Sequence, residues 1–197
     1  MKLIIASNNS HKVKEIKQIL GAHFDEILSL ADAGIEIDVI EDGKTFTENA
    51  LKKAAQVLDM SPDADAVLAD DSGLAVDALN GAPGIYSARF AGEGHNDEAN
   101  NQKLLDMMKD VPDGKRTCRF VCAMAMARRN KLDITSLGFV EGTLLREKHG
   151  ENGFGYDPLF YCDELGCSFA QADPQSKNAV SHRRRALDGM LEALSDS

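Results

Sequence analysis

The sequence predicts an α/β protein built on a mixed, twisted sheet flanked by helices, and two observations predict it. In the N-terminal half, short apolar runs alternate with segments of helical period, which is typical of alternating strands and helices. Further along, apolar residues recur at a spacing of two over residues 116–127, which is the period of a strand with one buried face. The second pattern favours antiparallel pairing, so a mixed sheet is expected rather than a purely parallel one.

A strand, a short turn and a helix open the chain. The apolar run at residues 3–6 predicts a buried strand, and a polar turn follows it. A helix is expected from about Ser10, because Val13, Ile16, Ile19 and Leu20 fall on one face. Gly21 is expected to end this helix.

The next elements surround a pair of carboxylates. Thr45 and Glu48 stand three residues apart and form a capping box, which predicts a second helix ending before residues 61–62. Residues 66–69 are apolar and predict a short strand. This strand is expected to run directly into a turn formed by residues 70–73, whose sequence is Asp-Asp-Ser-Gly.

The remaining elements complete the sheet and its helices. A third helix is expected over residues 97–109, antiparallel strands at residues 116–127 and 134–140, and a last helix from about Ser181. No repeat and no long Gly, Ser or Pro linker interrupts the chain of 197 residues. We therefore expect one domain spanning residues 1–197.

Composition limits the partners. The chain has 22 Lys and Arg against 32 Asp and Glu, so its net charge is −10 at pH 7. Such a chain repels nucleic acids and anionic membranes, and we expect neither as a partner. A nucleotide substrate would need a metal ion to offset its charge.

The opening apolar run is too short for a signal peptide or membrane span, which predicts a cytoplasmic protein. The four cysteines fit no metal-binding spacing and are expected to be reduced core thiols.

The first turn is a candidate phosphate site, because the backbone N–H groups that begin a helix attract anions. Lys12 would add a full positive charge in the first turn of the helix. The alternative is that Ser10 is simply an N-cap and Lys12 a solvated side chain. The residues of this candidate site are Ser7, Asn8, Asn9, Ser10, His11 and Lys12.

The strongest single signal is the pair Asp70 and Asp71. Adjacent carboxylates at a strand end cannot both be buried without partners, and carboxylate oxygens are ligands that Mg²⁺ accepts. Glu41 and Asp42 offer further carboxylates ahead of the second helix. The alternative is an ordinary turn facing solvent.

A basic cluster and an aromatic loop lie in the C-terminal half. Lys177 and residues 182–185 form a dense group of cations, which is either an anion site or an exposed helix face. The loop Phe154-Gly155-Tyr156-Asp157-Pro158 offers aromatic rings for stacking on a base and a carboxylate that can accept ring N–H groups. Alone, it is equally consistent with a packed turn.

Taken together, these segments resemble the inosine triphosphate pyrophosphatase family, which hydrolyses nonstandard purine nucleoside triphosphates. The matching blocks occur in the order found in that family and extend over almost the whole chain. They are residues 7–12 (SNNSHK), 41–50 (EDGKTFTENA), 69–74 (ADDSGL), 81–90 (GAPGIYSARF), 154–158 (FGYDP) and 181–183 (SHR).

The resemblance implies two lobes around a deep central cleft, and a homodimer. It implies that residues 7–12 hold the triphosphate and that Asp71 is the catalytic base and a metal ligand together with Glu41. Ser72 would contact the substrate. The base and phosphate pocket would contain Phe154, Gly155, Tyr156, Asp157, Lys177, His182 and Arg183. This sequence has Ser7 where the family usually has Thr, which keeps the hydroxyl, and Ile40 where many members have a second Glu, which narrows the acidic metal ligand of this segment to Glu41.

The expected reaction is Mg²⁺-dependent attack of water on the α-phosphorus of ITP, dITP or XTP, releasing pyrophosphate. Two alternatives stay open at this point. One is a pyrophosphatase for pyrimidine or modified-base triphosphates, and the other is a nucleotide-binding regulator without turnover.

Overall fold

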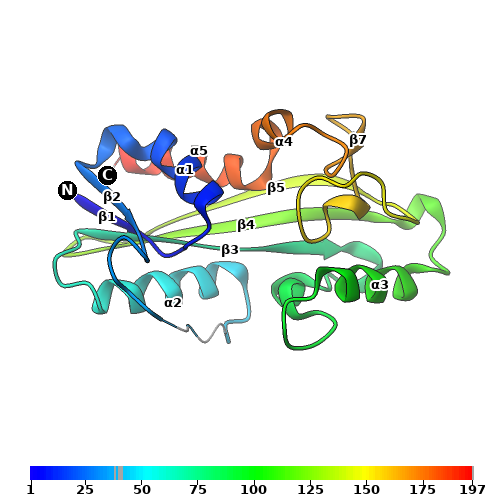
Figure 1. Cartoon of the computed structure of the whole chain (residues 1–197), viewed down its shortest axis with the longest axis horizontal. Helices are drawn as coiled ribbons and strands as arrows, with labels where there is room; N and C mark the ends of the chain where they lie inside the picture. Colours follow the sequence, from blue (N-terminus) through cyan, green and yellow to red (C-terminus); the bar gives the residue numbers. More distant parts are fainter. Residues whose placement is uncertain (38, 40–41, 197) are drawn as a thin grey trace. The chain divides into compact units, whose positions relative to one another are not determined.

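The computed structural model describes residues 1–37, 39 and 42–196 and contains a seven-stranded sheet in the order β2-β1-β3-β4-β5-β6-β7 (Figure 1). The strands are β1 (Lys2–Ile5), β2 (Glu26–Ser29), β3 (Ala66–Val76), β4 (Thr117–Arg128), β5 (Ile134–Leu144), β6 (Phe160–Cys162) and β7 (Cys167–Ser168). The α-helices are α1 (Ser10–Leu20), α2 (Phe46–Asp59), α3 (Asp97–Met108), α4 (Pro174–Val180) and α5 (His182–Ser195).

The mixed sheet expected from the sequence is confirmed. Strand β1 runs parallel to β2 and to β3, with Leu3 opposite Ile27 and Ala66. Strand β6 runs antiparallel to both β5 and β7. The helices expected from about Ser10, from the capping box and from residue 97 are present as α1, α2 and α3, and the last helix begins at His182 as α5. Strands β2, β6 and β7 and helix α4 are short, and no sequence pattern predicted them.

The chain divides into two compact units, and the first comprises Met1–Asp71, Cys122–Gly138 and Arg185–Ser197. Its sheet residues alternate between two cores. Leu3, Ile5 and Leu68 pack with α1 and α5 on one face, whereas Ile4 and Val67 pack with α2 on the other. Figure 1 shows α1 and α5 on one side of these strands and α2 on the opposite side. Adjacent residues of β3 therefore serve different helices.

The four residues Asp70-Asp71-Ser72-Gly73 correct one expectation. They lie inside β3, which is an 11-residue strand, and do not form a turn after a short one. The strand continues because both carboxylates, which are 7% and 9% exposed, have partners within the first unit. A buried charge with a partner does not have to end a strand.

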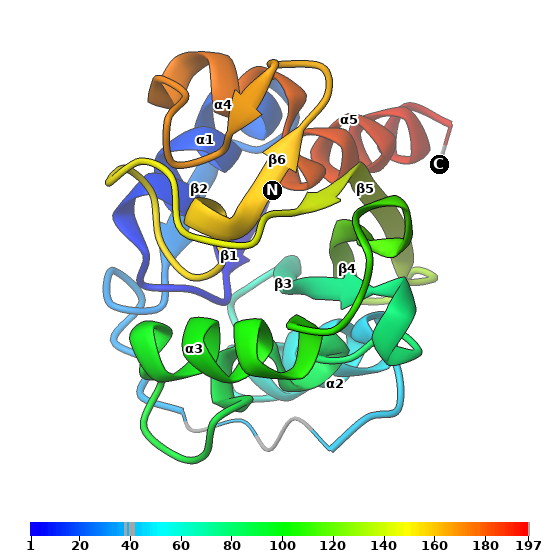
Figure 2. The same cartoon turned by 90° about the vertical axis from the view of Figure 1, so that its right-hand side faces the viewer.

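The second unit comprises Ser72–Val121 and Phe139–Arg184. Its core gathers Phe120, Phe160 and Phe169, whose ring centroids lie 4.7 to 5.7 Å apart. Figure 2 shows α3 and α4 on opposite sides of the strands of this unit.

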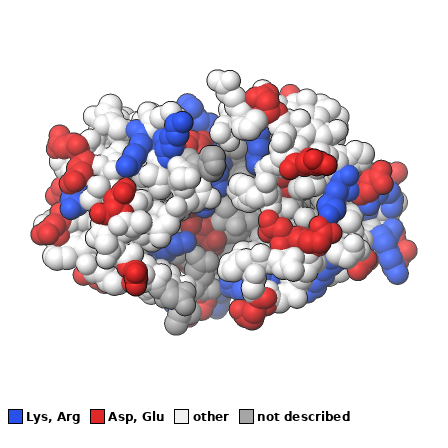
Figure 3. Space-filling view, in the orientation of Figure 1, with Lys and Arg blue, Asp and Glu red and all other residues white. Residues whose placement is uncertain are grey.

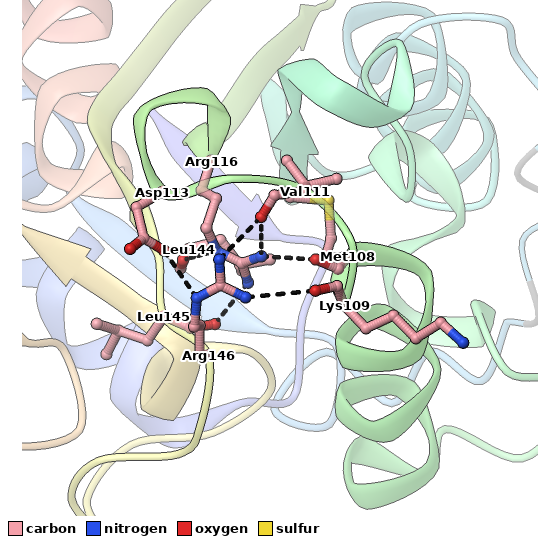
Figure 4. Close-up of polar contacts among 8 residues, drawn as sticks. All are labelled: Met108, Lys109, Val111, Asp113, Arg116, Leu144, Leu145 and Arg146. Atoms are coloured by element: carbon pink, nitrogen blue, oxygen red, sulfur yellow. Dashed lines mark hydrogen bonds and ion pairs between the residues drawn. The ribbon is translucent and has the colours of Figure 1, made fainter.

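Two arginines hold the C-terminal end of α3 (Figure 4). Arg116 is 2% exposed and donates to the carbonyl oxygens of Met108, Val111, Leu144 and Leu145. Arg146 is more exposed and donates to Asp113, Lys109 and Val111. The carbonyls at the end of a helix lack partners within it, and these guanidinium groups supply them.

All four cysteines are free thiols, as expected, and three of them are buried. Within the described residues, no helix combines the length and the apolarity needed to span a membrane. Figure 3 shows acidic side chains spread over the visible face, with lysines and arginines between them.

Candidate functional site

The two carboxylates of β3 point to opposite faces of the strand. Asp70 accepts a hydrogen bond of 2.6 Å from Lys12 Nζ of α1, while Asp71 accepts one of 2.9 Å from Asn49 Nδ2 of α2. This division follows from strand geometry, since Leu68 packs toward α1 and Ala69 toward α2. One carboxylate is thus neutralised by an ammonium group, and the other is oriented by an uncharged amide.

Asn49 fixes the orientation of Asp71 from the first turn of α2. The side chain is fully buried, and its Oδ1 accepts a 2.8 Å hydrogen bond from the backbone N–H of Gly43. The amide therefore has a partner at each end, which leaves it one orientation. Because the amide leaves the negative charge on Asp71, this carboxylate is suited to accept a proton or to bind a cation.

The first turn is built by side chains that bind its backbone. Asn9 Oδ1 accepts the N–H of Lys12 and acts as the N-cap of α1, so the alternative that made Ser10 the cap is wrong by one residue. Ser7 Oγ accepts the N–H of Asn9, and Asn8 Oδ1 accepts the N–H of Ala31. The turn between β1 and α1 and the first turn of α1 thus bring together Ser7, Asn8, Asn9, Ser10 and Lys12. The side chain of His11 lies outside the described residues.

The donor chemistry fits a hard divalent cation. Asp71 offers carboxylate oxygens at a position fixed by Asn49, and Mg²⁺ in proteins is held by one or two carboxylates together with water and phosphate oxygens. Glu41, the other expected ligand, lies outside the described residues. Within the described part of the chain, no cluster of three or more His, Cys, Asp or Glu side chains forms a complete metal cage. Such a cage is not what Mg²⁺ requires.

The aromatic loop of residues 154–158 belongs to the second unit and exposes one ring. Phe154 is 60% exposed, whereas Tyr156 is buried and its hydroxyl donates to the carbonyl oxygen of Ser87 over 2.8 Å. Gly153 has a φ of +79°, and a Cβ there would meet Asp157 Oδ2 at 2.1 Å, so only glycine fits. Phe154 is therefore presented by a tightly built loop.

Asp157 and Lys177 form a buried ion pair beneath this loop. The Nζ–Oδ2 distance is 2.5 Å, and the side chains are 13% and 4% exposed for Lys177 and Asp157 respectively. Asp157 Oδ2 also accepts the N–H of Phe154. Burial raises the pKa of the Asp157 carboxyl above its ordinary value, while Lys177 and the Phe154 N–H act in the opposite direction. Lys177 Nζ lies 5.0 Å from the Phe154 ring centroid and braces one side of that ring.

His182 and Arg183 follow Ser181, whose Oγ accepts the N–H of Arg184 and caps this helix start. The His182 ring is buried and stacks on Phe120 with centroids 5.0 Å apart. Arg183 Nε is buried and has no hydrogen-bond partner among the described residues. Ser72, the first residue of the second unit, is half-buried in β3.

Three residues that contact Asp71 or the aromatic loop had no role in the expectations from the sequence. Asn49 orients Asp71, while Asp97 and Asn101 of α3 both bind the backbone of Gly155. A signal for the two asparagines existed, because each occupies the apolar stripe of its helix, where a polar residue needs a specific partner. No comparable signal marked Asp97.

Comparisons with known proteins agree over almost the whole chain. A family model described as the Ham1 family matches residues 3–193. A dITP/XTP pyrophosphatase of Clostridium perfringens is 50% identical, with 98% of this chain and 97% of the relative covered. A dITP/XTP pyrophosphatase of Desulforamulus reducens is 48% identical, with 98% and 96% covered. The solved structure of the Staphylococcus aureus Ham1 protein is 40% identical, has a TM-score of 0.90, and covers 100% of this chain and 99% of its own.

Proposed function

Since this chain belongs to the Ham1 family, we propose that it hydrolyses the nonstandard purine nucleoside triphosphates ITP, dITP and XTP to the monophosphate and pyrophosphate, cleansing the nucleotide pool. It is a nucleoside triphosphate pyrophosphatase, a hydrolase acting on a phosphoric anhydride bond. The structural observation that carries this function is Asp71, a buried carboxylate held in one orientation by an uncharged amide.

Asp71 is the proposed catalytic base. It orients a water molecule for attack on the α-phosphorus and accepts a proton from it as the bond to pyrophosphate breaks. Lys12 and the backbone N–H groups that begin α1 hold the phosphates, together with Ser7, Asn8, Asn9, Ser10 and His11. Lys12 can do so from its place beside Asp70, since its side chain is 22% exposed. Ser72 follows Asp71 in β3 and contacts the substrate.

The enzyme uses a divalent metal, for which we propose Mg²⁺ with Asp71 and Glu41 as protein ligands. When bound, such an ion neutralises phosphate charge and makes a coordinated water more acidic. Gly43, two residues beyond Glu41 in the sequence, donates its N–H to Asn49, the residue that orients Asp71. This contact supports a ligand set drawn from the segment before α2 and from β3.

The second unit carries the proposed base-binding residues. The exposed ring of Phe154 is a stacking platform, which Gly155, Tyr156, Asp157 and Lys177 support. His182 and Arg183 are the proposed donors to the 6-oxygen of hypoxanthine and xanthine. Adenine places an amino donor at that position and leaves two donors facing each other, so ATP should be a very poor substrate. The buried Arg183 Nε without a partner among the described residues supports this role.

Three further features complete the proposal. The enzyme acts as a homodimer in the cytoplasm, residues 1–197 form a single catalytic domain, and neither nucleic acid nor membrane is a partner. The charge of −10 supports the last point, because it repels polyanions. Gel filtration with light scattering tests the dimer directly.

The decisive experiment incubates the pure protein with Mg²⁺ and, separately, ITP, dITP, XTP, GTP, ATP, dCTP and dUTP. The expected result is pyrophosphate and monophosphate from ITP, dITP and XTP, with ATP far behind. If no nucleotide were turned over, the protein would be a nucleotide-binding regulator without catalytic activity. If the pyrimidine nucleotides were turned over faster than the purines, it would be a pyrophosphatase for pyrimidine triphosphates. The names of the relatives favour neither alternative.

The same panel of nucleotides, repeated with Arg183→Ala, tests whether Arg183 recognises the base. This variant should lose most kcat/KM for ITP and reduce its advantage over ATP. An equal loss for every nucleotide would make Arg183 a phosphate ligand instead.

A further inference from the structure

Gly155 lies between the exposed Phe154 and the buried Tyr156, and its backbone determines how these two rings are presented. The flanking residues are fixed within the second unit, since Phe154 donates its N–H to Asp157 and Tyr156 donates its hydroxyl to Ser87. Gly155 has a φ of +59°, in the left-handed region that favours glycine. The contacts that hold Gly155 itself come from a different element, helix α3.

Two residues of α3 hold both polar groups of Gly155. Asp97 Oδ2 accepts the Gly155 N–H over 2.7 Å, and Asn101 Nδ2 donates to the Gly155 carbonyl oxygen over 2.9 Å. Asp97 and Asn101 are four residues apart, so they lie one turn apart on the same face of the helix. With donor and acceptor both bound, the peptide groups on either side of Gly155 are held in place, and with them the backbone from which the Phe154 ring extends.

The environment of Asn101 points to its hydrogen bond with Gly155 as the reason for an asparagine at this position. Asn101 is 4% exposed, and its Oδ1 is buried without a hydrogen-bond partner among the described residues. A buried acceptor without a partner destabilises the folded state, and an apolar side chain of similar size avoids that cost. The contribution of Asn101 is therefore its hydrogen bond to Gly155.

We propose that Asp97 and Asn101 are positioning residues that set the base selectivity of the enzyme by clamping Gly155. This inference rests on the proposed function, because it takes the Phe154 loop as the base-binding loop. A stacked base presents its 6-substituent to a donor in only one orientation of the platform. A loosened platform lets the base shift, and a shifted base loses the contact that separates a keto group from an amino group.

The test uses Asp97→Ala and Asn101→Leu in the full-length enzyme. Glu98→Ala is the matched control, because it removes the neighbouring acid of the same helical turn, whose partner is Lys148 rather than the loop. Asp97→Asn is the conservative rescue, because its amide oxygen still accepts the Gly155 N–H. For each protein, kcat and KM are measured with ITP and ATP, and hydrogen exchange is followed at the Gly155 amide.

Asp97→Ala and Asn101→Leu should lower the ratio of kcat/KM for ITP over that for ATP about tenfold, mainly through a higher KM for ITP. The kcat for ITP should stay within about threefold of native, and Tm within about 3 °C. The Gly155 amide should exchange faster in Asp97→Ala, while Glu98→Ala and Asp97→Asn should match the native enzyme in every measurement.

Two failures can be distinguished. If the native enzyme released no pyrophosphate from ITP, the proposed function would fail. If the native enzyme were active and Asp97→Ala and Asn101→Leu kept its selectivity, or lost ITP and ATP turnover equally, the clamp would have no role in base selection. Unchanged exchange of the Gly155 amide in Asp97→Ala would also overturn the proposal.

Discussion

Replacing each of the adjacent carboxylates of β3 by asparagine should separate catalysis from stability. Asp71→Asn removes the charge but keeps an oxygen that accepts the N–H of Asn49, so the buried contact survives. We expect the free energy of unfolding to change by no more than about 1 kcal/mol. Loss of a general base typically costs about 10²- to 10⁴-fold in rate, which raises the activation barrier by roughly 3–5 kcal/mol.

Asp70→Asn should give the opposite result. The carboxylate of Asp70 is 7% exposed and lies 2.6 Å from Lys12 Nζ, whose side chain is 22% exposed. The substitution leaves a mostly buried ammonium group beside a neutral amide. Full burial would cost several kcal/mol, and the partial exposure of Lys12 reduces this to about 1–3 kcal/mol. The kcat should stay within about tenfold of native, because Asp71 rather than Asp70 is the proposed base.

The assay pairs urea unfolding, followed by circular dichroism, with pyrophosphate release from saturating ITP. The two variants carry the same substitution at neighbouring positions of one strand, so each is the control for the other. Equal losses of kcat in two folded variants would refute the assignment of the base to Asp71. A folded Asp71→Asn with native turnover would refute it as well.

Three other outcomes are expected. Arg116→Met should lower the free energy of unfolding by about 3–5 kcal/mol, because it leaves buried carbonyl groups without a donor. Arg146→Met, at a side chain that is 51% exposed, should lower it by no more than about 1 kcal/mol. Equal losses of the two variants in urea unfolding would contradict this. Burial raises the pKa of Cys118 to about 12, so its thiol stays protonated between pH 7 and 9. Mass spectrometry should then find iodoacetamide on the more exposed Cys167, and rapid labelling of Cys118 in the folded protein would count against this. Chelation with EDTA should abolish pyrophosphate release without unfolding the protein, and added Mg²⁺ should restore it; turnover that persists in EDTA would exclude a metal-dependent reaction.

The sequence predicted the elements whose periodicity extends over several turns or residue pairs. Helices α1, α2 and α3 and strand β4 lie close to their expected bounds, because a long apolar stripe has one consistent interpretation. Strands β6 and β7 span three and two residues, which is too short for a period to be recognised. The extent of β3 was misjudged because Asp, Ser and Gly favour turns. That local preference is overridden by Lys12 and Asn49, which lie far away in the sequence.

The candidate site shows the same limit. The residue types of Asp71 and Lys12 point to their proposed chemistry, so the sequence alone is enough to propose them as site residues. Asn49 and Asn101 act through other residues, and only their place within an apolar stripe marks them. Asp97 has an exposed side chain at a helix start, where acidic residues are common, so its contact with Gly155 could be found only in three dimensions.

The alternation of side chains along β3 makes the alignment of this strand a chemical requirement. Ala66 pairs with Leu3 of β1, and from that point each step along the strand changes the face that a side chain occupies. Deleting one residue between Ala66 and Asp70 would turn Asp70 toward α2 and Asp71 toward α1. The ammonium group of Lys12 would then meet Asp71, the proposed catalytic carboxylate. Insertions and deletions of a single residue in this stretch should therefore abolish activity more completely than any point substitution there. They exchange the partners of Asp70 and Asp71 and also turn the apolar side chains of the strand toward the wrong core.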